Sequence, residues 1–298
     1  MRVFVTGATG FVGSAVVREL IGAGHRVVGL ARSDAAAAKL EEAGAEVHRG
    51  SLDDPEGLAA AARAADGVAH LAFRHDDFTD LGSAGALDLR AVEAIGAALE
   101  GSGKPFAVTS GMVAKAPGQI LTEEDEADPD GPMSHRAPTE AATLALADRG
   151  VRSSIVRLPP SVHGHGDRAF VPALIACARE RGVAGHVGDG ANRWPSVHRL
   201  DAARLFRLAL EGAAPGTRLH AADDEGVPLR DIASVIGRRL DVPVVGVPRG
   251  EAAAHFGWIG FMASLDLPAS SALTRERLGW KPEEVSLLAD LEDGHYFG

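Results

Sequence analysis

The sequence predicts a doubly wound α/β fold, in which helices cover both faces of a parallel sheet. Short apolar runs alternate with alanine-rich helical stretches through the first 160 residues. A glycine-rich segment lies between the first apolar run and the first helical stretch. Strands that alternate with helices of about 10–15 residues form βαβ units, whose strands are parallel. At 298 residues the chain has room for one large domain or two unequal ones.

The apolar runs are predicted as strands and the segments between them as helices. The strands are expected at Arg2–Thr6, His25–Ala31, Ala45–His48, Gly67–Ala72, Phe106–Ser110 and Ser153–Leu158. The helices are expected at Gly10–Ala23, Ala35–Ala43, Pro55–Ala65, Ala84–Gly101 and Thr139–Arg149. Asp54 before Pro55 is a helix-start signal, because an acidic N-cap followed by proline is typical of a first helical turn.

The regular alternation ends at Pro159 and Pro160. Glycine, proline and histidine crowd residues 161–195, after which Leu200–Glu211 is predicted as a helix and Thr217–Ala221 as a strand. Residues 223–298 predict two short helices and irregular pieces. We therefore expect a nucleotide-binding Rossmann domain over 1–160, to which 196–222 returns. Residues 161–195 and 223–298 would form a smaller, mostly helical substrate-binding cap over the carboxyl ends of the strands, where open α/β sheets bind ligands.

Composition argues against several function classes. A formal charge of −11 argues against a nucleic-acid partner, because phosphate neutralisation needs clustered Lys and Arg. The single cysteine, Cys177, excludes an internal disulfide and a Cys-rich metal site. The closely spaced His163, His165 and Asp167 lack a supporting helical ligand pair, so we expect no metal. No apolar stretch reaches the roughly 18–20 residues of a membrane span, and we expect a cytoplasmic protein without a membrane partner.

The glycine-rich segment predicts a dinucleotide site. Gly7, Gly10 and Gly13 follow the first strand and open the first helix. In this arrangement the first glycine permits a tight turn, the second lets a pyrophosphate approach the backbone, and the third allows close packing of helix and sheet. The phosphates then meet the free N–H groups of the helix N-terminus. The neighbouring Thr9, Phe11 and Val12 are predicted to contact the same cofactor.

The end of the second strand favours NADP(H) over NAD(H). An NAD site needs an acidic residue there for the ribose 2′-hydroxyl, roughly twenty residues past the glycines. The sequence offers Arg32 and Ser33 instead. A guanidinium can grip a 2′-phosphate, and a serine hydroxyl can add a hydrogen bond.

Several motifs resemble the short-chain dehydrogenase/reductase superfamily, in its extended and atypical branches of the NAD-dependent epimerase/dehydratase kind. They are Thr6-Gly7-x-x-Gly10-x-x-Gly13, His70-Leu71-Ala72, Arg157-Leu158-Pro159-Pro160-Ser161-Val162-His163-Gly164, Ser196-Val197-His198-Arg199-Leu200-Asp201 and Leu278-Gly279-Trp280-x-Pro282. The resemblance implies a Rossmann domain with an interleaved C-terminal substrate domain, and commonly hydride transfer. It implies further cofactor contacts at Ser51, Leu52, Leu71, Ala72, Phe73, Thr109, Pro159 and Val162.

The sequence departs from this family at its catalytic motif. The usual base is the tyrosine of Tyr-x-x-x-Lys, and Tyr296 near the C-terminus is the one tyrosine of this sequence. Spacing from Arg157 places Pro132 at the tyrosine position and Arg136 at the lysine position; another register pairs Arg136 with Glu140. The position of the family's catalytic hydroxyl falls on Gly111, one residue after Ser110.

Polar residues after strands four, five and six are the candidates to replace the tyrosine. They are His75, Asp76, Asp77, Ser110, Lys115, His163, His165 and Asp167, together with His135 and Arg136. Histidine titrates near neutrality, so His75 or His163 could supply a proton, with Asp76 or Asp77 orienting it. Arg136 could stabilise an oxyanion, and Ser110 could hydrogen-bond a substrate oxygen.

Three functions follow from this set. The leading hypothesis is an NADP(H)-dependent oxidoreductase that acts on a small organic carbonyl or alcohol with a non-tyrosine proton donor. The second is an NADP(H)-binding regulator or scaffold without redox turnover, which the missing tyrosine favours. The third is an epimerase, isomerase or lyase with tightly held cofactor. The expected partner is a small-molecule substrate, and a homodimer stays open.

Overall fold

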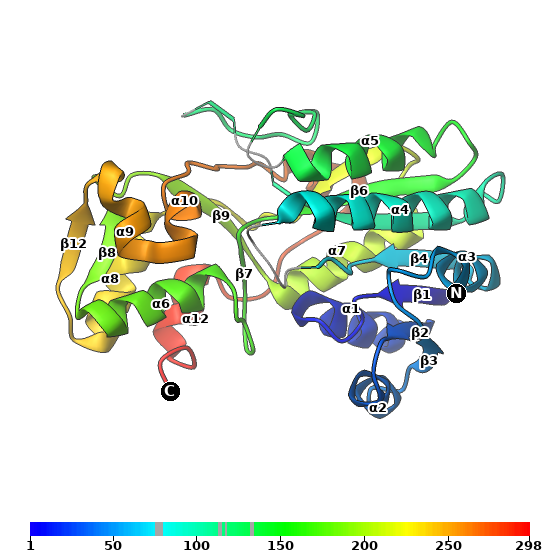
Figure 1. The fold of residues 1–298 in the computed structure, drawn as a ribbon, viewed down its shortest axis with the longest axis horizontal. Coiled ribbons are helices and arrows are strands. Elements are labelled where there is room, and N and C mark those ends of the chain that lie inside the picture. The colour runs from blue at the N-terminus through cyan, green and yellow to red at the C-terminus, as the bar shows by residue number, and fades with distance from the viewer. Residues whose placement is uncertain (75–79, 113–114, 117, 132–133) are drawn as a thin grey trace.

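The computed structural model describes the chain except for residues 75–79, 113–114, 117 and 132–133. Two parts lie side by side, a Rossmann part that contains the N-terminus and a smaller cap (Figure 1). The carboxyl ends of the main strands face the cap. The predicted doubly wound α/β fold is confirmed.

The Rossmann part is built on a seven-stranded parallel sheet in the order β10-β6-β5-β4-β1-β2-β3. Its strands are β1 (Arg2–Thr6), β2 (Arg26–Ala31), β3 (Glu46–Arg49), β4 (Gly67–His70), β5 (Pro105–Gly111), β6 (Arg152–Leu158) and β10 (Thr217–His220). The order reverses beside β1, so the loops after β1 and β4 diverge and leave a crevice at the carboxyl edge.

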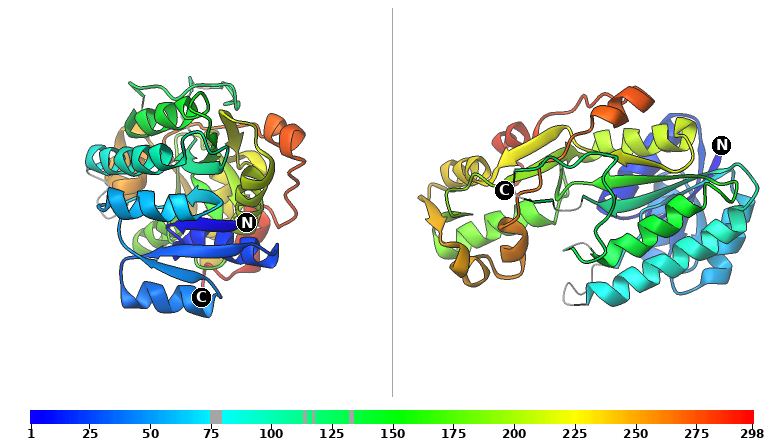
Figure 2. Two further views of the ribbon diagram at one scale, coloured as in Figure 1. Left: turned by 90° about the vertical axis from the view of Figure 1, so that its right-hand side faces the viewer. Right: turned by 90° about the horizontal axis from the view of Figure 1, so that it is seen from above.

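Helices cover both faces of this sheet, so the Rossmann part has three layers, helices, sheet and helices, when it is viewed along the strands (Figure 2). One face carries α1 (Phe11–Gly22), α2 (Asp34–Glu42) and α7 (Arg199–Gly212). The other carries α3 (Pro55–Ala64), α4 (Leu81–Leu99) and α5 (Ala137–Ala145), which follows the 3-10 turn η1 (Ser134–Arg136). Asp54 caps α3 as predicted, since its carboxylate accepts the Gly57 N–H at 2.9 Å ahead of Pro55.

The cap contains more regular structure than the sequence predicts. It has a three-stranded sheet and a two-stranded sheet, and its helices outnumber the two short ones expected. The strands are β7 (Ser161–His163), β8 (Ala184–Val187), β9 (Arg193–His198), β11 (Asp224–Pro228) and β12 (Val244–Val247). The helices and turns are α6 (Phe170–Arg181), α8 (Leu229–Leu240), η2 (Arg249–Glu251), α9 (Ala252–Phe256), η3 (Gly257–Ile259), α10 (Gly260–Ala263) and α12 (Leu287–Asp293). The cap is mostly helical, as predicted, and it carries in addition these short strands, which the sequence does not predict.

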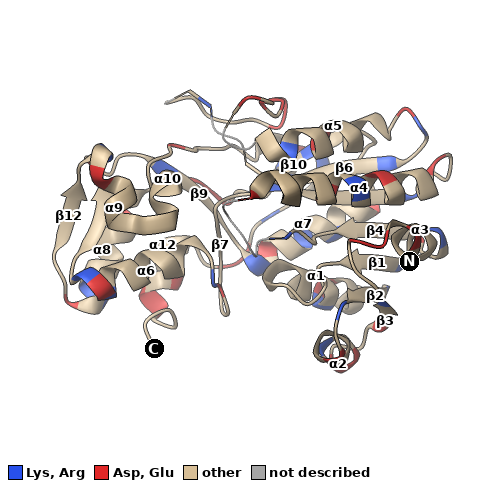
Figure 3. Ribbon diagram, in the orientation of Figure 1, with Lys and Arg blue, Asp and Glu red and all other residues tan. Residues whose placement is uncertain are grey.

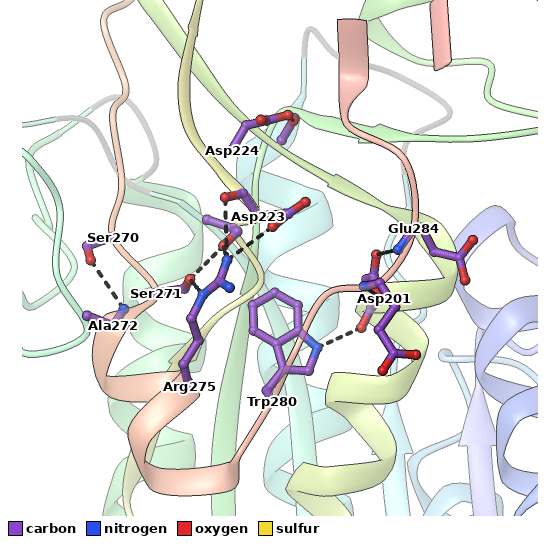
Figure 4. A network of polar contacts seen from close by, with 12 residues as sticks. Asp201, Asp223, Asp224, Ser270, Ser271, Ala272, Arg275, Trp280 and Glu284 are labelled. Carbon is purple, nitrogen blue, oxygen red and sulfur yellow. Dashed lines mark hydrogen bonds and ion pairs between the residues drawn. The ribbon is translucent and has the colours of Figure 1, made fainter. Parts of the chain in front are cut away.

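Part of the C-terminal segment returns to the Rossmann part. Helix α11 (Ala272–Leu278) lies beside β10 and α7, and Trp280 is fully buried in the same core as those elements. The Trp280 indole donates to the Asp201 backbone oxygen at 3.0 Å, and the Asp201 carboxylate accepts the Glu284 N–H at 3.1 Å (Figure 4). Two motifs distant in sequence thus meet at one buried aspartate. The domain boundaries drawn from the sequence stay a prediction.

Candidate active site

A cavity of about 1150 Å³ lies between the carboxyl ends of the Rossmann strands and the cap. Loops after β1, β2, β4, β5 and β6 line one side, and residues of α6, η3 and α10 line the other. Single ligand pockets usually measure about 300–1,000 Å³, so the space suits a dinucleotide with a second small molecule.

The glycine loop forms a cradle at one end of the cavity. Gly7 has a φ of +64°, and a Cβ there would lie 2.7 Å from backbone atoms of Leu71 and Ala72. A Cβ on Gly13 would lie 2.0 Å from the Gly7 oxygen. The Gly10 N–H donates to that oxygen at 2.9 Å, and no side chain caps the N-terminus of α1. The first-turn N–H groups of α1 are therefore free for a phosphate.

Cationic side chains lie at the end of β2. Arg32 and Lys39 line the cavity and are exposed. The Ser33 hydroxyl also lines it and accepts the Ala36 N–H at 3.2 Å, which caps α2. Asp34, the acid that follows Ser33 in the sequence, is paired with Arg49 at 2.6 Å. The cavity thus carries the cations Arg32 and Lys39 here, while the lining acid Asp53 is paired with Arg74 at 3.1 Å. Over the whole chain, both charge signs occur on both parts of the molecule (Figure 3).

The cavity brings together nearly all of the predicted cofactor contacts. Its lining includes Gly7, Thr9, Gly10, Phe11, Val12, Gly13, Arg32, Ser33, Leu52, Leu71, Ala72, Phe73, Thr109, Pro159 and Val162. Ser51 is not among the lining residues, because its hydroxyl accepts the Asp53 N–H at 3.1 Å inside the turn before α3. The adjacent Leu52 and Asp53 face the cavity instead.

Polar atoms without partners collect deeper in the cavity. Ser110 is 3% exposed and Arg136 is 7% exposed, and both line the cavity. The Ser110 Oγ, the Thr109 Oγ1 and the Arg136 Nε have no hydrogen-bond partner among the described residues. Burying such an atom unpaired costs about 1–3 kcal/mol, which a bound substrate or cofactor oxygen would relieve.

A buried polar chain holds Arg136 in place. His70 Nε2 donates to Asp88 Oδ1 at 3.0 Å, and Arg136 donates to Asp88 Oδ2 at 3.3 Å. At the far end, Thr6 Oγ1 accepts the N–H groups of Leu71 and Ala72 at 3.2 Å, so its own hydrogen is directed to His70 Nδ1 at 2.9 Å.

The guanidinium of Arg136 also lies over the ring of Phe73, with its carbon 3.4 Å from the ring centre. Burial alone would raise the pKa of Asp88, but the His70 hydrogen bond and the Arg136 charge hold that pKa below its usual value. The roles of Asp88 and His70 were not predicted from the sequence. An acid in the middle of a helix carries no signal of what it faces.

His163 lies outside the cavity, contrary to its predicted role. Val162 lines the cavity, and in strand β7 the next side chain points to the opposite face. His163 is 1% exposed, and its Nδ1 lies 2.9 Å from Asp290 Oδ2. This position does not suit a proton donor to a substrate in the cavity. His75, Asp76, Asp77 and Pro132 lie outside the described residues.

The two alignments considered for the missing Tyr-x-x-x-Lys motif involve Arg136 and Glu140, and the structure places these two side chains differently. Arg136 faces the cavity, whereas Glu140 is buried away from it and receives two hydrogen bonds from Arg157, at 3.0 and 2.6 Å. Lys115 is paired with Asp125 at 2.6 Å. His135 lines the cavity beside Phe73.

The C-terminal tail reaches the rim of the cavity through Tyr296. Its hydroxyl donates to Asp167 Oδ2 at 3.1 Å and accepts the Gly164 N–H at 3.1 Å. Asp167 lines the cavity, whereas Tyr296 is not among the lining residues. Burial raises the pKa of the Asp167 carboxyl. The tyrosine of this sequence thus positions a rim loop.

The comparison that decides the family is a profile match. The profile of the NAD dependent epimerase/dehydratase family matches residues 3–220. This chain belongs to that family. The match spans most of the chain and confirms the resemblance drawn from its motifs.

Relatives match most or all of the chain. An uncharacterized protein of Schizosaccharomyces pombe is 49% identical over 298 residues, 100% of both chains. An uncharacterized protein of Saccharomyces cerevisiae is 47% identical over 293 residues, 98% of each. The 2-alkyl-3-oxoalkanoate reductase of Stenotrophomonas maltophilia is 27% identical over 271 residues, 86% of this chain and 79% of the reductase.

Solved structures agree on the fold. The dTDP-glucose 4,6-dehydratase DesIV of Streptomyces venezuelae, solved with NAD bound, superposes with a TM-score of 0.80 at 21% identity and covers 99% of this chain and 96% of its own. In the part of our chain that the structure describes, no helix is both long enough and apolar enough to cross a membrane. The same residues hold no group of three or more His, Cys, Asp or Glu suited to a metal ion.

Proposed function

We propose that this protein is an NADP(H)-dependent oxidoreductase that interconverts a small organic carbonyl compound and its alcohol. The observation that carries the proposal is a single cavity with a glycine cradle in one part and unpartnered buried atoms of Ser110 and Arg136 in another. Such a cavity offers a place for the cofactor and, beside it, a place for an oxygen that gains negative charge.

The charge at the end of β2 supports NADP(H) as the cofactor. Arg32 and Lys39 line the cavity there, and Asp34 is already engaged by Arg49. A guanidinium fork matches a phosphate in geometry and charge, and Lys39 adds a second cation. An NAD site would instead present an acid to the ribose 2′-hydroxyl.

A bound NADPH would supply the hydride to the carbonyl carbon, and the alkoxide formed there would take its proton from water at the mouth of the cavity. The protein's contribution is at the carbonyl oxygen, where the Arg136 guanidinium and the Ser110 hydroxyl would donate hydrogen bonds. Arginine stays protonated in proteins, so Arg136 acts by its charge and not as a proton donor. The 27% identical 2-alkyl-3-oxoalkanoate reductase and the 27% identical quinoline-oxide ketoreductase of Stigmatella aurantiaca support reduction as the reaction.

The cofactor assignment is tested by titrating NADPH and NADH into the purified protein. We expect NADPH to bind more tightly by about ten- to a hundred-fold, because a charged hydrogen bond to the 2′-phosphate contributes roughly 1.5–3 kcal/mol. Arg32→Ala should remove most of that preference. Arg26→Ala is the matched control, because Arg26 lies at the opposite end of the same strand and pairs with Glu46.

Equal affinities for the two cofactors in the unmodified protein would overturn the NADP(H) assignment. An unchanged preference in Arg32→Ala would exclude Arg32 alone and direct attention to Lys39. Tight NADPH binding with no turnover across a broad screen of carbonyl compounds would favour the regulator or scaffold over the oxidoreductase.

A further inference from the structure

The cap side of the cavity is an apolar wall, formed by Phe170, Trp258, Phe261 and Met262. Trp258 is 53% exposed and Phe261 is 58% exposed, although both are large hydrophobic side chains. Exposed apolar groups gathered at the mouth of a cavity mark a binding surface more often than chance exposure.

The wall is held in a fixed position by buried contacts. The Trp194 indole, fully buried, donates to the Met262 oxygen at 3.1 Å. The Asn192 side-chain amide donates to the Ala263 and Leu265 oxygens at 2.9 and 3.0 Å. These bonds tie α10 and the residues directly after it to β9 and the residue directly before it. The exposed aromatic side chains are therefore presented by an anchored backbone, which lowers the ordering cost of binding.

Phe170 joins this wall to the core of the cap. Its ring packs edge-on to Trp194, with ring centres 5.9 Å apart, and lies 5.6 Å from the Trp258 ring. Across the cavity, Phe73 and the buried Met112 line the Rossmann side close to Arg136 and Ser110. An apolar body would thus be held between two apolar surfaces, with its oxygen at the polar atoms.

The charges of the cap wall do not suit a sugar nucleotide. The described residues that line this side carry one cation, Arg168, and one acid, Asp167, next to each other. A pyrophosphate needs several donors or cations, and sugar hydroxyls need polar partners that aromatic rings do not offer.

We propose that the substrate is an uncharged, mostly apolar ketone or aldehyde whose alkyl or aryl group lies against Phe261, Trp258 and Phe170. This inference rests on the proposed function for the reaction, but its binding part can be tested alone.

The test uses the NADPH-loaded protein with butanone and methyl hexyl ketone, which share the methyl ketone and differ in chain length. UDP-glucose serves as the polar comparison. We expect kcat/KM for methyl hexyl ketone to exceed that for butanone by at least about tenfold, because each buried methylene contributes about 0.8 kcal/mol. Phe261→Ala should reduce this preference roughly tenfold. Val285→Ala, an exposed apolar position elsewhere at 52% exposure, should leave it unchanged.

Binding without turnover separates the two proposals. Calorimetric titration of methyl hexyl ketone into the NADP⁺-loaded protein should show binding that Phe261→Ala weakens, with thermal unfolding confirming that the variant is folded. Binding of this kind without reduction would overturn the oxidoreductase and support the apolar site. Equal kcat/KM for the two ketones, or UDP-glucose that competes with methyl hexyl ketone, would overturn the apolar-substrate inference and leave the oxidoreductase standing.

Discussion

Arg136 links a buried polar chain to the cavity. Arg136 lines the cavity, one side of its guanidinium pairs with Asp88, and its buried Nε has no hydrogen-bond partner among the described residues. Burial lowers the pKa of Arg136, while the charge of Asp88 opposes that shift. A cation that is already desolvated and oriented needs little reorganisation when a substrate oxygen gains charge, which is the condition for strong electrostatic catalysis.

Replacing Arg136 tests this role at the residue scale. Arg136→Lys keeps a cation for Asp88 but lacks the Nε–H donor and the planar fork, so we expect kcat to fall by about 10²-fold or more. NADPH affinity should change little. The shape of the pH–rate profile should also stay the same, because arginine does not titrate in the working range.

Ser110→Ala is the companion variant, because Ser110 would contact the same oxygen without a charge. We expect a smaller loss of kcat than in Arg136→Lys, with the same profile shape. Two results together would contradict the role of Arg136. Arg136→Lys would be fully active, and replacing a histidine would remove one of the pH-dependent changes in rate. The chemistry would then depend on a titrating group and not on Arg136.

The N-terminus of α1 is the element on which cofactor binding depends. A Cβ on Gly10 would meet one atom, the Gly7 oxygen, at 3.1 Å, whereas a Cβ on Gly13 would overlap it at 2.0 Å. Substitution at Gly10 therefore extends into the cavity, while substitution at Gly13 displaces the helix from the strand. A substitution at Gly10 should therefore impair cofactor binding, whereas a substitution at Gly13 should impair folding.

Gly10→Val is expected to weaken NADPH binding by about a hundredfold or more while the protein stays folded, because the side chain occupies the approach to the first-turn N–H groups. Calorimetric titration and thermal unfolding measure the two properties. Gly22→Val is the matched control on the same helix, since nothing lies within 4 Å of its Cβ position. Undiminished binding in Gly10→Val would place the phosphates elsewhere.

The predictability of each element from sequence follows its burial. The inner strands of the central sheet, β1, β2, β4, β5 and β6, are mostly buried, and their apolar runs predict β1 at its observed bounds and the others within two residues of theirs. The edge strands β3 and β10 are less buried and are predicted within one residue from their place between helical segments. The sequence does not predict helix α6, because glycines, prolines and histidines surround it. The cap strands have three to six residues, too few for a clear alternation.

The sequence predicts those parts of the candidate site whose shape depends on backbone turns, and not those that depend on the direction of side chains. The glycine cradle and the end of β2 depend on backbone turns, which the sequence motif specifies. The direction of a side chain depends on register, so the sequence predicts His163 in the cavity although Val162 occupies that face of β7. The His70–Asp88–Arg136 chain joins residues up to 66 positions apart in a packing that local patterns do not encode.

At the scale of the whole molecule, His220 joins the Rossmann sheet to the returning C-terminal segment. It is fully buried at the end of β10, and its Nδ1–H donates to the Ser270 oxygen at 2.8 Å. Its Nε2 accepts from Arg157 at 3.4 Å, and its backbone N–H donates to the Thr274 hydroxyl at 2.7 Å. Because both ring nitrogens are engaged in this way, the folded protein holds the neutral form. Burial lowers the pKa of His220 to about 4, from 6.5.

This shift predicts how stability depends on pH. Between pH 6.5 and about 4 the unfolded chain binds a proton at His220 that the folded protein does not, so the free energy of unfolding falls as the pH falls through that window. The loss from this group should be on the order of a few kcal/mol.

His220→Gln retains an acceptor for Arg157 and a donor for Ser270 but does not titrate. We therefore expect a lower but flatter Tm between pH 6.5 and 4. The exposed His165, replaced by Gln, is the control and should leave the slope as it is in the unmodified protein. A Tm profile of His220→Gln parallel to that of the unmodified protein would mean that His220 binds its proton as readily in the folded protein as in the unfolded chain. The contact between β10 and the returning segment would then be held by a charged imidazole, and the acid sensitivity of this fold would have to come from other groups.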